Sequence, residues 1–270
     1  MFGTGLSAIT FMAVPAKTFA TDWAYFMRAL PILLIPILVN WLFIPFYRKL
    51  EVTTAYEYLE MRFNLPTRLL ASFSFLIFQL GRIGVVLFLP AIALNVITGF
   101  NIYWCILLMG GISLLYTMMG GIEAVVWTDV IQVIVLLGGG LLCLTLMILH
   151  FENGVSEIIQ IGTEDQKFNM FNMAFDFKQP TFWVVIIGGF FSNLIVYSSD
   201  QTMVQRYLTT PDTLGAQKSL WTNIIISFVS SALFFFIGTA LYAFFKDQPQ
   251  HLIPVMSSTC LLYTSDAADE

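Results

Sequence analysis

Charge is what this sequence has least of. Only 11% of its 270 residues are Asp, Glu, Lys or Arg, whereas soluble domains carry about 25%. Apolar residues make up 58% of the chain, and the mean hydropathy is +0.81. A soluble core cannot hide this much apolar surface. The composition therefore excludes a soluble globular domain and predicts a membrane protein.

Reactive side chains are also scarce. The two histidines, His150 and His251, fall at predicted loop positions. The three cysteines form no CxxC or Cys/His pattern, so neither a zinc site nor a disulfide framework is indicated. No nucleophile stands beside a base and no acidic pair marks a metal–diphosphate site, which argues against an enzyme. The net charge of −5 includes no basic run, so nothing indicates nucleic-acid binding.

Long apolar stretches make up most of the chain. A transmembrane helix needs about 20 such residues to cross the hydrocarbon core. The stretches predict an all-α, polytopic protein embedded in the lipid bilayer. Residues 53–67 are charged with apolar residues on one side, which predicts a short interfacial helix, and residues 150–180 form the longest polar loop. The seven predicted crossings, the first incomplete, are residues 1–19, 23–46, 68–98, 102–119, 123–149, 182–207 and 220–245.

The two ends of the sequence are unusual. Met1 is followed at once by an apolar, glycine-containing run without a basic leader, so we expect the natural N-terminus to be missing. At the other end, residues 260–270 resemble an in-frame translation of the adapter used in transposon-based DNA sequencing libraries. We therefore interpret residues 1–259 as part of a transmembrane domain and residues 260–270 as a sequencing artefact.

Arg82 is the clearest charge inside an apolar stretch. It lies midway along the third crossing, between Gly81 and Gly84. A charge at the bilayer centre costs about 2.5–3.5 kcal/mol on insertion scales, so such a residue indicates function. Its planar guanidinium suits the carboxylate of a solute. A structural pair with a carboxylate or with backbone carbonyls of the protein explains it equally well.

Asp129 is the second such charge. It stands beside Thr128 early in the fifth crossing, and carboxylate and hydroxyl oxygens suit a hard cation such as sodium. From position alone, an acid that caps the helix N-terminus and faces water is the favoured interpretation. Asp200 and Gln201, at the end of the sixth crossing, are best explained as residues that solvate a helix end or brace a loop.

Two segments have the composition of broken helices. Gly3 and Gly5 lie among hydroxyl residues at the start of the chain, and Gly188 and Gly189 precede Asn193 in the sixth crossing. Backbone can unwind in a membrane only where it lines a cavity, so glycine-rich breaks indicate carbonyls turned toward an ion or solute. Close helix packing by small residues is the alternative. The two segments lie five crossings apart, the spacing of a five-helix inverted repeat.

Three strings carry a family likeness: residues 54–63, 120–132 and 200–207. The chain resembles the sodium:solute symporter family, which includes sodium/glucose, iodide and monocarboxylate carriers. Within the family, residues 7–17, together with Arg82 and Asp129 and their neighbours, are most similar to bacterial sodium/sialic acid symporters. The resemblance covers about residues 3–255.

The resemblance implies a leucine-transporter-like inverted-repeat fold, of which the chain would hold the first seven core helices. It further implies that the carbonyls of Gly3 and Leu6 contribute to a main sodium site completed by serines on an absent eighth helix. Asp129 would match an acid tied to a second sodium site or to sodium release. The implied solute-binding residues are Ser7, Thr10, Tyr25 and Arg82, with Arg82 taking a carboxylate, and Asn193 is added to them.

The chain departs from the sialic acid carriers at three positions. Gly3 stands where alanine is usual, Gly5 replaces a hydroxyl residue, and Ala29 replaces a glutamine that contacts sugar hydroxyls. Losing the second and third contacts weakens the case for sialic acid itself, and Arg28 beside Ala29 offers partial compensation.

We expect sodium-coupled symport of an anionic solute, such as a sialic acid, another sugar acid or a carboxylate, by a multi-pass protein of the bacterial inner membrane. A symporter of a neutral sugar and a transporter-like sensor domain of a signalling protein remain alternatives. A channel and a membrane-embedded enzyme are less favoured.

Overall fold

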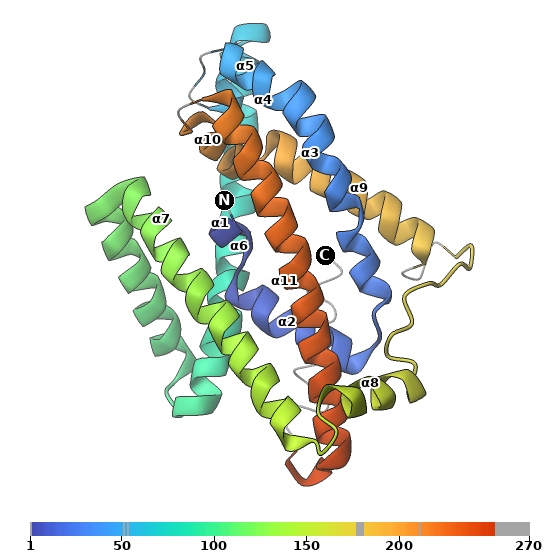
Figure 1. The fold of residues 1–270 in the computed structure, drawn as a ribbon. Coiled ribbons are helices and arrows are strands. Elements are labelled where there is room, and N and C mark those ends of the chain that lie inside the picture. Colours follow the sequence, from blue (N-terminus) through green and yellow to red (C-terminus); the bar gives the residue numbers. More distant parts are fainter. Residues whose placement is uncertain (1, 51, 53, 177–180, 211, 252–270) are drawn as a thin grey trace. The chain divides into compact units, whose positions relative to one another are not determined.

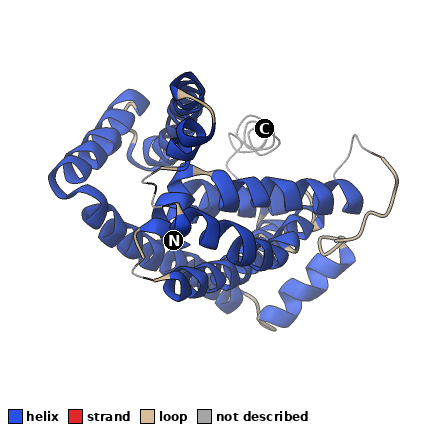
Figure 2. Cartoon of the chain, turned by 90° about the horizontal axis from the view of Figure 1, so that it is seen from above, coloured by secondary structure: helices blue, strands red, loops and turns tan. Residues whose placement is uncertain are grey.

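The computed structural model describes residues 2–50, 52, 54–176, 181–210 and 212–251 (Figure 1). Every regular element among them is helical, which confirms the predicted all-α class (Figure 2). The elements are α1 (Phe2–Gly5), α2 (Ala8–Ala20), η1 (Ala24–Ala29), η2 (Pro31–Leu34), α3 (Ile35–Leu38), η3 (Val39–Phe43), α4 (Ile44–Lys49), α5 (Ala55–Arg62), α6 (Leu65–Thr98), α7 (Ile102–His150), α8 (Val155–Glu164), α9 (Phe182–Ser199), α10 (Gln201–Leu208), α11 (Thr213–Asp247) and η4 (Pro249–His251).

Six helical segments among the described residues are long and apolar enough to cross a membrane. These six spans confirm the second to seventh predicted crossings. The incomplete first crossing corresponds to the shorter apolar helix Ile9–Ala20. The short helix predicted over residues 53–67 is found as α5. The six spans are Ala24–Lys49, Leu65–Thr98, Ile102–Gly121, Glu123–His150, Phe182–Ser199 and Thr213–Asp247.

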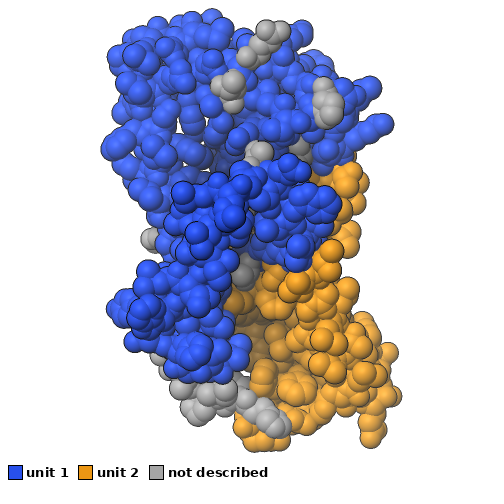
Figure 3. All heavy atoms as spheres, turned by 90° about the vertical axis from the view of Figure 1, so that its left-hand side faces the viewer, with its two compact units in different colours: residues 1–9, 37–133, 195–220 blue, residues 10–36, 134–194, 221–270 orange. Residues whose placement is uncertain are grey.

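The chain divides into two compact units, coloured separately in Figure 3. Neither unit is a continuous piece of chain, because each comprises three segments. The dividing points fall inside α2, α3, α7, α9 and α11. Unit 1 comprises residues 1–9, 37–133 and 195–220, and unit 2 comprises residues 10–36, 134–194 and 221–270.

A small apolar core in unit 1 joins α4, α5 and α10. Tyr47, Ala55 and Val204 are buried against one another and against Val52. Burial of such side chains stabilises the contact by about 1.5–3 kcal/mol for each large apolar residue. This core therefore holds two short helices that would not be stable in isolation.

Polar residues brace the ends of these helices. Asp200 accepts a hydrogen bond from the Thr202 amide (2.8 Å) and thereby caps α10. The neighbouring Gln201 accepts one from the Ala55 amide (2.9 Å), and Arg48 donates to the Thr210 carbonyl (2.9 Å). Asp200 and Gln201 thus have the structural role that the sequence favoured. The sixth crossing, however, ends at α9 rather than continuing to Tyr207, because Asp200 starts a new helix.

Aromatic side chains form the core of unit 2. Trp23 and Phe26 are buried against Phe235 of α11, with ring centroids 5.2–5.6 Å apart. The Trp23 indole donates to the Thr239 hydroxyl (2.9 Å), so its polar group is satisfied inside the core. This contact fixes the chain between α2 and η1 onto α11.

Two further predictions need correction or addition. Gly188 and Gly189 do not break the sixth crossing, because α9 runs through them as one helix. Residues 150–180 are not only a polar loop, since α8 forms within them and buries Ile158 and Gly162. Residues 260–270, interpreted as an artefact, lie outside the described residues.

Gly238 provides a test of the packing between α2 and α11. A Cβ atom at this position would lie 2.6 Å from the Pro15 carbonyl oxygen and 2.6 Å from Thr18 Cβ. Backbone atoms cannot move aside cheaply, so Gly238→Ala should destabilise the protein by about 1–3 kcal/mol. The measurement is the midpoint of thermal inactivation in detergent. Gly139→Ala is the control, because a Cβ there meets nothing within 4 Å. An equal midpoint for both variants would contradict the packing.

Candidate functional site

The first apolar helix is broken, as its glycine-rich start predicts. α1 ends at Gly5, α2 begins at Ala8, and Leu6 and Ser7 between them are not helical. The Leu6 amide closes the last turn of α1 by donating to the Phe2 carbonyl (3.0 Å), and the Leu6 side chain is buried. Carbonyl groups next to such a break lose their intrahelical partners. The break therefore places main-chain oxygens where a cation can be bound.

The broken segment packs against Asp129 within unit 1. A Cβ atom at Gly3 would lie 2.8 Å from Asp129 Cβ and 2.9 Å from its carbonyl oxygen. The structure thus brings together two of the three residues assigned to sodium, and Leu6 lies in the same short segment. The missing side chain of Gly3 permits this close approach of α1 to α7.

A kink in α7 precedes Asp129. Gly121 has φ 55° and ψ −146°, a conformation that residues with a side chain rarely adopt, and it separates the predicted fourth and fifth crossings. Thr128, beside the acid, uses its hydroxyl within its own helix by donating to the carbonyls of Ala124 and Val125 (3.0 Å each). The Asp129 carboxylate is therefore the chemically distinctive group of this turn.

Asp129 forms an ion pair that sequence reasoning missed. The Arg206 guanidinium of α10 donates to its carboxylate at 3.1 Å, and the two side chains are 12% and 20% exposed, respectively. This pairing replaces the interpretation of Asp129 as a helix cap that faces water. Removing one member of a partly buried pair leaves the other charge uncompensated. The 77 positions between the two residues explain why no local pattern indicated the contact.

Arg82 has different surroundings. It lies in α6 within the span Leu65–Thr98, and its side chain is exposed. Among the described residues it forms no hydrogen bond or ion pair. A Cβ atom at Gly81 or at Gly84 would meet nothing within 4 Å, so neither glycine admits a close neighbour. The structural pair considered for Arg82 is therefore not formed within the described part of the chain.

Tyr25 and Asn193, two of the predicted solute-binding residues, lie in unit 2 with Arg28 between them. The Arg28 guanidinium donates to the Tyr25 hydroxyl (2.7 Å) and lies 5.7 Å from the Tyr25 ring centroid. The Arg28 backbone and Cγ also lie against Gly189 of α9, whose missing side chain permits the contact. Asn193 donates to the Gly189 carbonyl (2.7 Å). Gly189 thus serves close packing rather than a helix break.

The predicted site residues fall into two groups. Gly3, Leu6, Ser7, Arg82 and Asp129 belong to unit 1, whereas Thr10, Tyr25 and Asn193 belong to unit 2. Ser7 lies at the helix break and Thr10 in the first turn of α2, and both are half-buried. No three His, Cys, Asp or Glu side chains gather in the described ranges. A cation bound in this part of the chain would therefore rely on main-chain and hydroxyl oxygens with Asp129.

Comparisons with known proteins agree with this picture. The model of the sodium:solute symporter family matches residues 1–264. The chain is 37% identical to the sodium/sialic acid symporter SiaT of Proteus mirabilis, over 96% of this chain and 52% of that protein. It is 36% identical to NanT, a sodium/sialic acid symporter of Aliivibrio fischeri, over 93% of this chain and 50% of that one. The sodium-coupled monocarboxylate transporter 1 of Xenopus laevis is 32% identical, over 90% of this chain and 39% of the transporter.

The fold is also similar to a solved structure. A Na⁺-coupled sialic acid symporter in a substrate-bound, outward-open state, reported with a novel Na⁺ site, superposes with a TM-score of 0.88 and 37% identity. The match covers 94% of this chain and 54% of that one, which confirms the predicted leucine-transporter-like fold. The chain spans about half the length of the bacterial relatives it matches. This chain, a multi-pass membrane protein, belongs to the sodium:solute symporter family.

Proposed function

We propose that this chain forms part of a sodium-coupled symporter that imports a small anionic organic solute. The observation that carries the proposal is Arg82, an exposed residue inside a membrane span whose guanidinium has no protein partner in the described part. Intramembrane charges are rare and mark ion or solute pathways. A planar guanidinium matches a carboxylate through two parallel hydrogen bonds.

The sodium side of the proposal rests on the broken first helix. Sodium is a hard cation and prefers carbonyl, hydroxyl and carboxylate oxygens. The break at Leu6 and Ser7 supplies backbone oxygens, and Asp129 packs directly against Gly3. We assign the Gly3 and Leu6 carbonyls to one sodium ion and Asp129 to a second ion or to sodium release. Sodium here is a transported ion, taken up with the solute and released on the other side.

The solute side rests on a mixture of charge and hydroxyl groups. Arg82 would hold the carboxylate, while Ser7 and Thr10 would contribute hydroxyl contacts. In unit 2, Tyr25 and Asn193 are held next to Arg28, which adds a second cation for an anionic solute. We therefore favour a sialic acid, another sugar acid or a carboxylate over a neutral sugar.

Coupling to sodium makes accumulation possible. A membrane potential contributes about 2.3 kcal/mol per elementary charge per 100 mV. Sodium that binds before the solute orders the helix break and favours the outward-facing state, and solute binding then favours closure and exposure to the inside. One or two sodium ions per cycle supply enough free energy for useful accumulation. Uptake by the complete gene product in proteoliposomes should require an inward sodium gradient, and gradient-independent uptake would contradict the proposal.

Arg82 can be tested in the same assay with labelled sialic acid and other sugar acids. Because the substitution leaves a solute carboxylate without its partner, Arg82→Ala should raise the KM for an anionic solute by roughly 100-fold. Arg62→Ala, at an exposed arginine of α5 outside the spans, is the control and should have no such effect. An unchanged KM in Arg82→Ala would remove the carboxylate clamp, and uptake of neutral sugars instead would favour the neutral-sugar alternative.

Asp129 can be tested separately through the sodium dependence of uptake. Asp129→Asn keeps the shape of the side chain but removes its charge, so the sodium concentration for half-maximal uptake should rise about tenfold. Arg206→Gln breaks the same ion pair while leaving the carboxylate in place. It should therefore not raise that concentration. If both variants raise it equally, Asp129 acts through its ion pair and not through sodium.

A further inference from the structure

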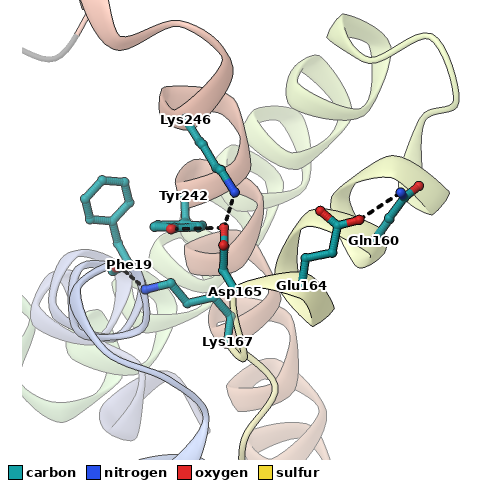
Figure 4. Close-up of polar contacts among 7 residues, drawn as sticks. All are labelled: Phe19, Gln160, Glu164, Asp165, Lys167, Tyr242 and Lys246. Carbon is teal, nitrogen blue, oxygen red and sulfur yellow. Dashed lines mark hydrogen bonds and ion pairs between the residues drawn. The ribbon is translucent and has the colours of Figure 1, made fainter.

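A buried lysine in unit 2 lies just beyond α8 (Figure 4). Lys167 is only 8% exposed, although lysine is almost never buried without a partner. The chain reaches this position through Gln166, whose φ of 55° is rare for a residue other than glycine, and the Lys167 amide donates back to the Gly162 carbonyl (2.8 Å). The turn thus directs Lys167 inward, at the expense of local backbone strain.

Lys167 binds the end of α2 with both its side chain and its main chain. Its ammonium group donates to the carbonyls of Phe19 and Thr21 (2.8 Å each). Its own carbonyl accepts a hydrogen bond from the Trp23 amide (3.0 Å). The last carbonyls of a helix lack intrahelical partners and carry partial negative charge, so a lysine there is favourable. Lys167 therefore binds the turn that connects α2 to η1 through three hydrogen bonds.

Neighbouring groups stabilise the buried charge. Lys167 Nζ lies 4.0 Å from the centroid of the Tyr242 ring, over its electron-rich face. Burial lowers the pKa of Lys167, and the negative charges of Asp22 and Asp165 oppose that shift. A hydrogen bond from Lys246 holds the pKa of Asp165 below its ordinary value. Asp165 also accepts a hydrogen bond from the Tyr242 hydroxyl (3.1 Å), so the acid is fixed beside Lys167 (Figure 4).

The turn that Lys167 holds leads directly into η1. Trp23 stands at the start of η1, and its ring also packs against Phe168, the residue after Lys167 (centroids 5.4 Å apart). Asp22 accepts a hydrogen bond from the Ala24 amide (2.9 Å), which begins the first turn of η1. η1 carries Tyr25 and Arg28, the pair assigned above to the solute. The position of this pair is thus set, at its N-terminal side, by contacts of Lys167 and Phe168.

We propose that Lys167 is a positioning residue for solute binding, which fixes the turn between α2 and η1 and thereby the Tyr25–Arg28 pair. The inference rests on the proposed function, because it takes these two residues to contact the solute. Lys167 itself touches no solute. A lysine that merely stabilised the fold would change the amount of active protein and hence the maximal rate, whereas a positioning lysine changes the solute KM.

The experiment compares three variants of the complete gene product in the sodium-driven uptake assay. Lys167→Met retains the apolar stem but loses both hydrogen bonds, so the solute KM should rise roughly tenfold with a smaller change in maximal rate. Lys167→Arg keeps a cation with several donors and should restore most of the affinity. Lys246→Met is the matched control, since it removes a lysine of the same cluster that binds Asp165 but not α2. Its KM should stay near that of the wild type.

Amide hydrogen exchange gives a second readout that does not need transport. In Lys167→Met the amides of residues 19–25 should exchange faster than in the wild type or in Lys246→Met. A lowered maximal rate with an unchanged KM, or an equal KM rise in Lys246→Met, would overturn the positioning role. If the wild type shows no sodium-dependent uptake, the proposed function fails instead. In that case the role of Lys167 is tested by adding sialic acid and measuring amide exchange. The added solute should slow the exchange of residues 19–28 in the wild type but not in Lys167→Met. Equal effects in both proteins would overturn the inference.

Discussion

Lipid offers no partner to a backbone N–H or C=O group, and this constraint governs where the chain can depart from a helix. α6 and α11 run for 34 and 35 residues, respectively. The first apolar helix is broken over Leu6 and Ser7, and α7 is kinked at Gly121. Asp129 packs against the first of these sites through Gly3 and lies eight residues after the second. A break that is costly in lipid becomes favourable when an ion occupies the oxygens that it frees.

Asp129, Arg82 and Lys167 differ in the groups that neutralise their charges. Asp129 is matched by Arg206 inside the protein. Arg82 is matched by no described residue, and a guanidinium in a membrane span then needs water or an anion. Lys167 is matched by carbonyl groups at a helix end and by an aromatic ring. Of the three, only Arg82 offers its full set of donors to a ligand.

Sequence reasoning succeeded where the signal is local. An apolar run of about 20 residues has few alternatives to a spanning helix, so the spans were predicted, although the sixth ends eight residues earlier and the seventh begins seven residues earlier than expected. The predicted helix break at Gly189 was wrong. A glycine in the sequence looks the same whether it breaks a helix or leaves room for a neighbouring side chain such as Arg28. Sequence reasoning also missed the partner of Asp129 and the role of Lys167. Both depend on residues far apart in the chain, which periodicity and composition do not report.

The separation between Asp129 and Arg206 in the sequence also means that the two residues are synthesised at different times. Arg206 lies 77 positions after its partner, and synthesis proceeds at about 5–20 residues per second, so the carboxylate exists for roughly 4–15 seconds before the guanidinium is made. The fifth crossing must therefore enter the membrane machinery with a lone acid early in its length. The strongly apolar residues that follow Asp129 in α7 offset the free-energy cost of inserting this carboxylate into the membrane. The ion pair with Arg206 can form only after α10 has been synthesised.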